Sequence, residues 1–395
     1  MNRKIRLISI LLFIGIFIIY LSTSGGETPY NHFTLLADAF LKGKLFITGN
    51  YPWLEKVPIN GDITNFFVVN PPMPAILSIP FVFIFGKNFP QQYLAHLIGA
   101  GFTVLTFFLS LKVKKDLKLA VWSTLLVGLG SIVWFLSSVG STWYLGQIVS
   151  CFFLTIALIE TLGKKRPIVL GISLAFVYLS RSHLALTFPI FLYLSQPQLF
   201  KKGIFVKKFK KFMLFATPIG VVLVLDMLYN YARYHTLFNS GYFLIPGTSN
   251  EPWFSKGIMH PSYILADLKI AFLAMPIFLD KFPYIQPSWA GMAIWLTTPA
   301  FFFALKAQAK EKLVKYVWLA ILLVFLVVGA HGGTGFAQFG YRFAVDFYPF
   351  LILLTIKGVA KQKGPRKIHW MLMCIGILVN LWGVIWINKF GWVGW

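Results

Sequence analysis

The chain alternates between long apolar segments and shorter polar ones. Nine apolar segments of roughly 17 to 22 residues are long enough to cross about 30 Å of hydrocarbon as helices. These segments are 5–22, 91–111, 119–138, 147–163, 212–230, 287–305, 314–330, 343–360 and 369–387. The run 167–196 is also apolar, but Arg181-Ser182-His183 interrupts it, so we expect two short helices there. The pattern therefore predicts eleven crossings, an odd number that places the two termini on opposite sides of a membrane.

The composition agrees with this interpretation. Hydrophobic residues make up 57% of the 395 residues and charged residues only 12%, and the mean hydropathy is +0.73. These values exclude an ordinary soluble protein. We predict an all-α polytopic membrane protein with about eleven transmembrane helices that form a single membrane domain over residues 1–395.

The net charge of +24, from 36 Lys and Arg against 12 Asp and Glu, would suggest a nucleic-acid partner in a soluble chain. Here 25 of the 36 cations fall in the segments that the eleven crossings place on one side. Those segments are 1–6, 112–118, 164–166, 201–211, 306–315 and 357–369. By the positive-inside rule, the N-terminus is cytoplasmic and the C-terminus extracytoplasmic. We expect no nucleic-acid partner, and anionic membrane lipids as passive partners of the inner cations.

The first apolar segment follows Arg3, Lys4 and Arg6 and ends at Ser22-Thr23-Ser24, a pattern that a cleaved signal peptide also shows. The apolar run is long for a signal core. We therefore predict an uncleaved membrane anchor, and either reading leaves the remaining topology unchanged.

Two outer segments, 23–90 and 231–286, are too long to be simple connectors. Long ordered loops usually carry function. The apolar run 71–86 within the first is only about 15 residues long and contains several prolines, so we expect it to lie against the outer face rather than cross. The last six residues, 390–395, contain two tryptophans and predict an interfacial aromatic anchor.

A polar stripe is expected on one face of the helix that ends the segment 212–230, because its members follow i, i+3, i+4, i+7 spacing. The members are Asp226, Tyr229, Asn230 and Arg233. Ionisable groups at membrane depth are costly and need partners. The stripe is either a structural seam of hydrogen bonds and ion pairs or one wall of a substrate site.

A glycine-rich loop, residues 331–335, precedes Tyr341, Arg342 and Asp346 at the start of the segment 343–360. Arg342 and Asp346 are one helical turn apart and could form an ion pair. Alternatively, a guanidinium that remains partly free at the membrane boundary could bind a lipid phosphate with two parallel hydrogen bonds. We favour phosphate contact, because the glycines let backbone or ligand come close.

The first long loop contains Glu27, Asp38, Glu55 and Asp62. Asp38 lies in 33–43, which reads as a short amphipathic helix ended by a glycine. A carboxylate packed under a helical bundle could have a raised pKa and act as general base, although a single aspartate on a helix is commonly just solvated. The histidines show no metal-binding spacing, so we expect neither a metal nor a cofactor.

The order of these features resembles the GT-C superfamily of integral-membrane glycosyltransferases, in particular protein mannosyltransferases and aminoarabinose transferases. The shared features are a first span followed by a long outer loop, the helix around Asp38, the proline segment Asn70-Pro71-Pro72-Met73-Pro74, the basic inner turn 112–118, and the late Gly340-Tyr341-Arg342. The resemblance covers most of the chain in architecture.

The resemblance implies transfer of a sugar from a polyprenyl-phosphate carrier to an acceptor at the extracytoplasmic face. An acid of the first loop would be the base, Asp38 first and Glu27 second. Substrate-binding residues would be Arg342, Tyr341, Asp346, Arg233, Asp226 and Gln147. Relatives commonly carry an acidic pair directly after the first span, whereas this chain has Pro29-Tyr30-Asn31-His32 there, and its outer turn 140–147 contains no acid.

Two other functions fit parts of the sequence. A transporter or flippase for a lipid or polar solute is suggested by the stripe from Asp226 to Arg233 and by Arg181-Ser182-His183. A catalytically silent membrane subunit would also use long aromatic outer loops, for partner binding. The sequence does not indicate an oligomeric state.

Overall fold

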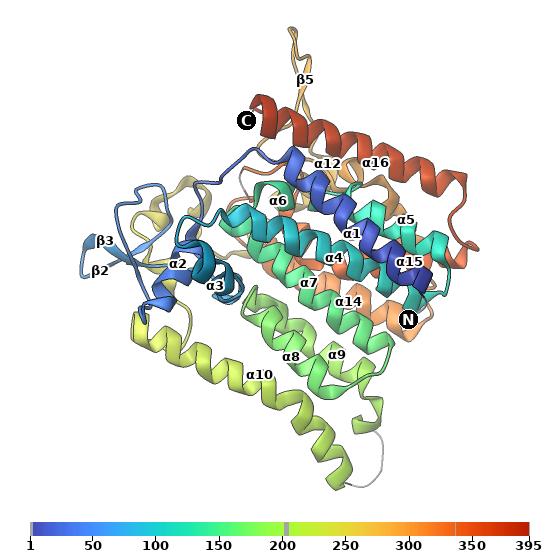
Figure 1. The fold of residues 1–395 in the computed structure, drawn as a ribbon, viewed down its shortest axis with the longest axis horizontal. Coiled ribbons are helices and arrows are strands. Elements are labelled where there is room, and N and C mark those ends of the chain that lie inside the picture. The colour runs from blue at the N-terminus through green and yellow to red at the C-terminus, as the bar shows by residue number, and fades with distance from the viewer. Residues whose placement is uncertain (1–2, 201–204, 336, 395) are drawn as a thin grey trace.

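In the computed structural model, residues 3–200, 205–335 and 337–394 are described. Residues 201–204 of the inner segment 201–211 and Trp395 of the C-terminal aromatic segment lie outside them. The long helices run side by side as a bundle, and the segments that follow α1 and α10 gather at one end of it (Figure 1). The two chain ends lie at opposite ends of the bundle. The chain is a multi-pass integral membrane protein.

Six helices of the described chain are long and apolar enough to cross a membrane. They are α1 (Arg3–Thr23), α4 (Gln91–Val113), α7 (Thr142–Leu162), α10 (Phe205–Tyr234), the continuous pair η7 (Arg342–Phe347) and α15 (Tyr348–Lys361), and α16 (Lys367–Ile385). The η7–α15 span is central, with 89% of its most apolar 18-residue stretch buried, whereas α1 and α10 are peripheral, with 17% and 6% of theirs buried.

A seventh span is bent. Helices α5 (Leu117–Gly128) and α6 (Val133–Val139) meet at 53°. Gly128 ends α5 and Gly130 lies within the break, and glycines weaken a helix at such a point. The single span expected over 119–138 is therefore two helices joined at a kink.

Shorter helices complete the bundle. Because these helices are short, the expected count of eleven transmembrane helices is not confirmed. The two short helices expected in 167–196 are present as α8 (Pro167–Tyr178) and as η1 (Ser182–Thr187) with α9 (Phe188–Ser195). Helix α14 (Lys312–Val328) has 17 residues. The segment 287–305 is not one helix, because Pro299 separates α13 (Ile294–Thr297) from η6 (Pro299–Lys306).

The first long loop contains strands, so the all-α prediction was incomplete. Between α2 (His32–Leu41) and α3 (Met73–Phe85), three antiparallel strands pair in the order β1-β3-β2. They are β1 (Ile47–Thr48), β2 (Val57–Ile59) and β3 (Asp62–Phe67). Asn60 and Gly61, at φ 51° and 79°, form the two-residue turn between β2 and β3, the strongest short hairpin signal a sequence can carry.

The first loop is packed onto the bundle. Its buried residues, such as Phe33, Leu36 and Phe66, form one apolar cluster with Leu145 and Val149 of α7. The first loop is thereby held against the first turns of α7.

The second long loop is mostly irregular. Its elements are α11 (Gly241–Leu244), η3 (Thr248–Asn250), η4 (Pro252–Phe254), η5 (Pro261–Tyr263), α12 (Ile264–Leu273), β4 (Ile277–Phe278) and β5 (Ile285–Gln286). Two further short helices, η2 (Pro197–Phe200) and the π-helix η8 (Trp386–Phe390), follow α9 and α16. Both long loops reach the same end of the bundle, where they cover the start of η7.

Candidate functional site

A cavity of about 320 Å³ lies where the two long loops meet the helix ends. Its walls come from the residues before α3, the start of α7, η1, the second loop, the end of α14 and the start of η7. Its polar lining residues are Asn70, Arg181, Ser182, His183, Asn239, Tyr242, His331 and Arg342. The cavity is therefore built from segments far apart in the sequence, and it is polar on several sides.

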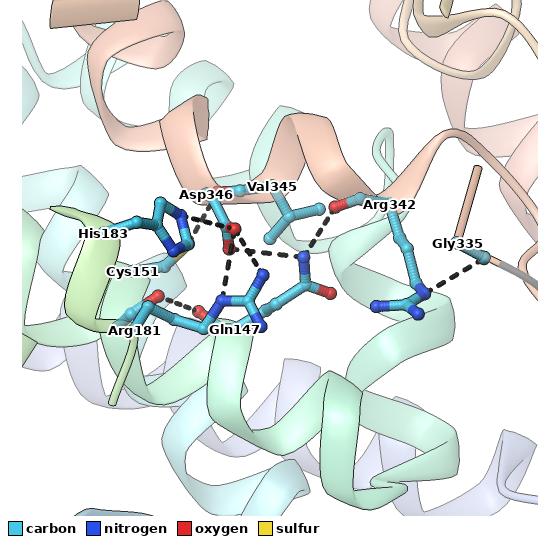
Figure 2. Close-up of polar contacts among 9 residues, drawn as sticks. Gln147, Cys151, Arg181, His183, Gly335, Arg342, Val345 and Asp346 are labelled. Carbon is cyan, nitrogen blue, oxygen red and sulfur yellow. Dashed lines mark hydrogen bonds and ion pairs between the residues drawn. The ribbon is translucent and has the colours of Figure 1, made fainter. Parts of the chain in front are cut away.

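Asp346 does not line the cavity but holds two residues that do, Arg181 and His183 (Figure 2). Its carboxylate is fully buried and lies 2.6 Å from the Arg181 guanidinium and 3.0 Å from His183 Nε2. Gln147 Nε2 donates to the other carboxylate oxygen at 3.2 Å. A buried carboxylate is tolerated only with such partners, so Asp346 fixes η1 against η7.

The spacing of Arg342 and Asp346 allows an ion pair between them, but the two side chains do not pair in the structure. The Arg342 side chain points away from Asp346 (Figure 2), and its Nε donates to Gly335 O at 3.1 Å. Its guanidinium carbon lies 5.9 Å from the Tyr144 ring centre and 5.0 Å from that of Phe343. Among the described residues, no carboxylate lies within ion-pair distance of Arg342 and its two terminal nitrogens make no hydrogen bond. Arg342 thus brings to the cavity a guanidinium that has no ion-pair partner among the described residues.

The backbone around Arg342 is held by side-chain amides. Gln147 Nε2 donates to Arg342 O at 2.8 Å, and Gln338 Oε1 accepts from Arg342 N at 2.7 Å. Gln338 Nε2 donates to Thr334 O at 2.6 Å, which closes the glycine-rich loop. Gly335 has φ +86°, a conformation that favours glycine. The loop therefore sets the position of the guanidinium.

Glu55 of the first loop does not line this cavity, but it lies next to two residues that do, Trp143 and Tyr242. It is half-buried, and Trp143 Nε1, from the cavity wall, donates to its carboxylate at 3.2 Å. Burial raises the pKa of Glu55 above 4.5, while hydrogen bonds from Trp143 and Tyr242 and the positive charge of Arg342 oppose the rise. A carboxylate with a raised pKa next to a cavity is a candidate functional group.

His331 also lines the cavity, among three aromatic rings. Its ring centre lies 5.5 to 5.9 Å from those of Phe254, Phe343 and Tyr242. Burial lowers the pKa of His331 to about 4, and the nearby arginines add to this effect. The imidazole is therefore neutral at pH 7, and its Nδ1 has no hydrogen-bond partner in the described residues.

The fold is similar to that of ArnT from Cupriavidus metallidurans. Against the structure bound to undecaprenyl phosphate, the TM-score is 0.57 at 9% identity, and the match covers 96% of this chain and 64% of that one. Against the apo structure, the TM-score is 0.54 at 11% identity, with 93% and 62% covered. No protein-family model and no curated protein matches the sequence. The chain has a GT-C-like fold. It spans somewhat less than two thirds of the length of these ArnT structures.

Within this GT-C-like fold, the acids predicted as bases lie away from the cavity. Asp38 is on α2, pairs with Lys42 Nζ at 2.7 Å, and lines a separate hollow of about 110 Å³ that shares no lining residue with the larger cavity. Glu27 is exposed in the segment between α1 and α2. The base role of either residue stays a prediction, and the structure brings neither together with Arg342.

The polar stripe of α10 is a connected seam, and none of its members lines either of the two larger cavities. Asp226 accepts from Tyr178 of α8 at 2.9 Å and from Asn230 at 3.1 Å. Arg233 donates to Asn230 at 2.8 Å and to Val68 O of the first loop at 2.7 Å. The seam ties α10 to α8 and to the first loop.

Tyr341 is fully buried, and its hydroxyl donates to Asp267 Oδ1 on α12 at 2.8 Å. Tyr341 holds α12 against η7 and does not line the polar cavity. Burial raises the pKa of Asp267 to about 7, and the hydrogen bond from Tyr341 opposes the rise.

Glu55 is the residue that sequence reasoning did not assign to the site. It was recognised only as one of four acids in the first loop. Its local sequence, Tyr51-Pro52-Trp53-Leu54-Glu55, carries no motif, and its approach to Trp143 follows from the packing of the first loop on α7. In the part of the chain that the structure describes, no group of three His, Cys, Asp or Glu side chains could hold a metal ion.

Proposed function

We propose that this protein is a glycosyltransferase that moves a sugar from a polyprenyl-phosphate carrier to an acceptor hydroxyl at the extracytoplasmic face. The observation that carries the proposal is a polar cavity lined by the guanidinium of Arg342, which has no ion-pair partner among the described residues, with the carboxylate of Glu55 directly behind the lining residue Trp143. The GT-C-like fold agrees with this reaction class. The ArnT structure bound to undecaprenyl phosphate provides an example of such a lipid on this fold.

An apolar groove next to the cavity supports a lipid-linked donor. It has a volume of about 410 Å³ and is lined by apolar side chains of α12, α13, η6, α14, η7 and α15. Helix α14 and η7 line both spaces: Val328 and Phe343 face the polar cavity, and Phe325 and Phe347 face the groove. The groove therefore begins one helical turn from the polar cavity, as a ligand with a polar head and an apolar tail requires.

In this arrangement each group has one chemical task. The acceptor oxygen attacks the anomeric carbon of the sugar while its proton passes to Glu55. The bond between that carbon and the carrier phosphate oxygen breaks, and the lipid phosphate leaves with the electron pair. Arg342 stabilises the negative charge that develops on the departing phosphate. Arg181 remains paired with Asp346, so its main contribution is to the shape of the cavity.

The stripe from Asp226 to Arg233 was the main reason to consider a transporter. Its polar groups are engaged with one another, with α8 and with Val68. No feature of the described residues favours transport over transfer.

The test compares Glu55→Gln with Asp38→Asn, two substitutions that each replace a first-loop carboxylate by its amide. Purified protein in lipid nanodiscs is given a polyprenyl-phosphate sugar, and release of polyprenyl phosphate is measured. We expect Glu55→Gln to lower the rate by about 10²- to 10⁴-fold, as for loss of a general base, and Asp38→Asn to leave it nearly unchanged.

The pH dependence gives a second readout. Because the base must be ionised, the wild-type rate should rise with pH through a midpoint above the ordinary glutamate value, and Glu55→Gln should lack that rise. The opposite result, a large loss in Asp38→Asn with normal Glu55→Gln, would return the base role to Asp38. Absence of both transfer and lipid-sugar binding would remove the glycosyltransferase assignment.

A further inference from the structure

The hairpin formed by β4 and β5 exposes three large aromatic side chains. Ile277 pairs with Gln286 and Phe278 with Ile285. The hairpin extends away from the bundle beside the end of α16 (Figure 1). Phe278, Phe282 and Tyr284 are 70%, 68% and 62% exposed. We call residues 277–286 the aromatic hairpin.

Such a hairpin is unfavourable in water. A two-stranded sheet is at best marginally stable there, and exposed apolar clusters usually mark an interaction surface. The tip carries Asp280 and Lys281, both exposed, so it has no net charge. The aromatic hairpin therefore needs an apolar or interfacial environment. Because its tip has no net charge, electrostatics do not prevent it from entering such an environment.

The base of the aromatic hairpin is fixed to the C-terminal segment. Trp386 Nε1 donates to Ile285 O at 3.1 Å, and Trp289 N donates to Gly394 O at 2.7 Å. The ring centres of Phe282 and Trp392 lie 5.1 Å apart. These contacts set the hairpin at the level where α16 ends.

The outer surface of α16 is continuous with the aromatic hairpin. Met371, Ile375 and Leu378 are exposed at spacings of four and three residues, which places them on one helical face. That face leads toward Phe390 in η8, which is 51% exposed and stacks on Trp392 at 4.4 Å. Because α16 is a membrane-spanning helix, this apolar face contacts lipid chains.

We propose that the aromatic hairpin inserts into the headgroup region of the leaflet at which α16 ends, with phospholipid as its partner. Phe278, Phe282 and Tyr284 occupy the boundary between acyl chains and headgroups, about 5 to 10 Å deep, as amphipathic elements do. Asp280 and Lys281 remain among the headgroups. The C-terminal aromatic anchor expected from the sequence is thereby extended by an internal segment, and this proposal is independent of the reaction.

The experiment measures the depth of the hairpin in a bilayer. Phe282→Cys is introduced in a Cys374→Ser background, because Cys374 is exposed and Cys151 is buried. The full chain is labelled with an environment-sensitive fluorophore and reconstituted into phosphatidylcholine vesicles. Ser249→Cys, an exposed position of the second loop, is the matched control.

Nitroxide lipids labelled near the headgroup should quench the label at 282 several-fold more strongly than the label at 249. Iodide equilibrated on both sides should show the reverse order. Equal iodide quenching at both positions would overturn the proposal. Protection from both quenchers, with energy transfer between labels on different molecules, would overturn it in favour of an interface between two copies.

A second variant tests whether the aromatic rings cause the insertion. Phe282→Ser with Tyr284→Ser, labelled at Phe278→Cys, should become several-fold more accessible to iodide than the same label in the unchanged hairpin. Unchanged accessibility would mean that the backbone alone sets the position of the hairpin, and would contradict the role of the aromatic side chains. Gel filtration confirms that each variant remains folded.

Discussion

At the residue scale, the decisive feature is that Tyr341, directly before η7, and Arg342 and Asp346 within it make different contacts. Tyr341 turns into the protein to bind Asp267, Arg342 turns toward the cavity, and Asp346 is neutralised by Arg181 from η1. Local spacing allowed an ion pair between Arg342 and Asp346. The long-range pair with Arg181 could not be predicted, because it depends on where η1 packs. For the same reason, the sequence pointed to Asp38, while the structure brings Glu55 into contact with Trp143 in the cavity wall.

Arg342 should dominate the affinity for the lipid phosphate. Hydrogen bonds to a charged group contribute about 1.5–3 kcal/mol each, so we expect Arg342→Gln to weaken binding of polyprenyl phosphate by roughly 10- to 100-fold. Binding is measured in nanodiscs by microscale thermophoresis. Lys256→Gln, which removes one exposed cation from the second loop, is the control and should stay near wild type. Equal losses in both variants would indicate a general charge effect rather than a phosphate site.

Asp267 should make stability depend on pH. Its pKa in the folded protein is raised from 3.8 to about 7, so across that range the folded state holds a proton that the unfolded state has released. Stability must then fall as pH rises. Thermal unfolding in detergent should show a larger decrease in Tm between pH 4 and pH 7 for wild type than for Asp267→Asn. Parallel Tm profiles of the two proteins would exclude this role.

At the scale of elements, the helices were largely predictable and the loops were not. Apolar run length located the long helices, and Arg181-Ser182-His183 correctly marked the break between α8 and η1. Small strands were missed, although Asn60-Gly61 marked the turn between two of them. Their pairing brings β2, and with it the neighbouring Glu55, to the bundle. Strands of two to six residues are too short to be detected from the lengths of apolar runs.

The glycine-rich loop before η7 should be intolerant of side chains. A Cβ at Gly335 would lie 3.1 Å from Gln338 Oε1 and 3.3 Å from Arg342 Nε, and φ +86° is strained for alanine. We expect Gly335→Ala to weaken polyprenyl-phosphate binding about tenfold while the protein remains folded. Gly247→Ala, at φ +81° in the second loop with open space around it, is the control for backbone strain alone. Similar binding losses in both variants would show that strain, not the position of Arg342, is responsible.

At the scale of the whole molecule, charge distribution predicts a topology, and the packing of the loops forms the cavity. The sequence predicted opposite sides for the termini, and the two chain ends lie at opposite ends of the bundle (Figure 1). The cavity could not be located in this way, because it requires both long loops to fold back over one bundle end.

The predicted orientation can be measured directly. A reporter enzyme that is active only outside the cytoplasm should be active when fused after residue 394 and inactive when fused after Lys363, in the inner segment 357–369. Activity at Lys363 alone would reverse the topology. It would also place the cavity, and the proposed transfer, on the cytoplasmic face.

The groove that begins behind Phe325 and Phe347 is open along its side. Phe302, Leu305 and Leu322 are 53%, 69% and 51% exposed, so this wall faces the surrounding lipid instead of enclosing a ligand. A carrier seated there would touch protein only with the isoprene units nearest its phosphate, and the remainder would extend freely among the acyl chains. Selection would then act on the head of the carrier, and short synthetic prenyl phosphates would substitute for long natural ones.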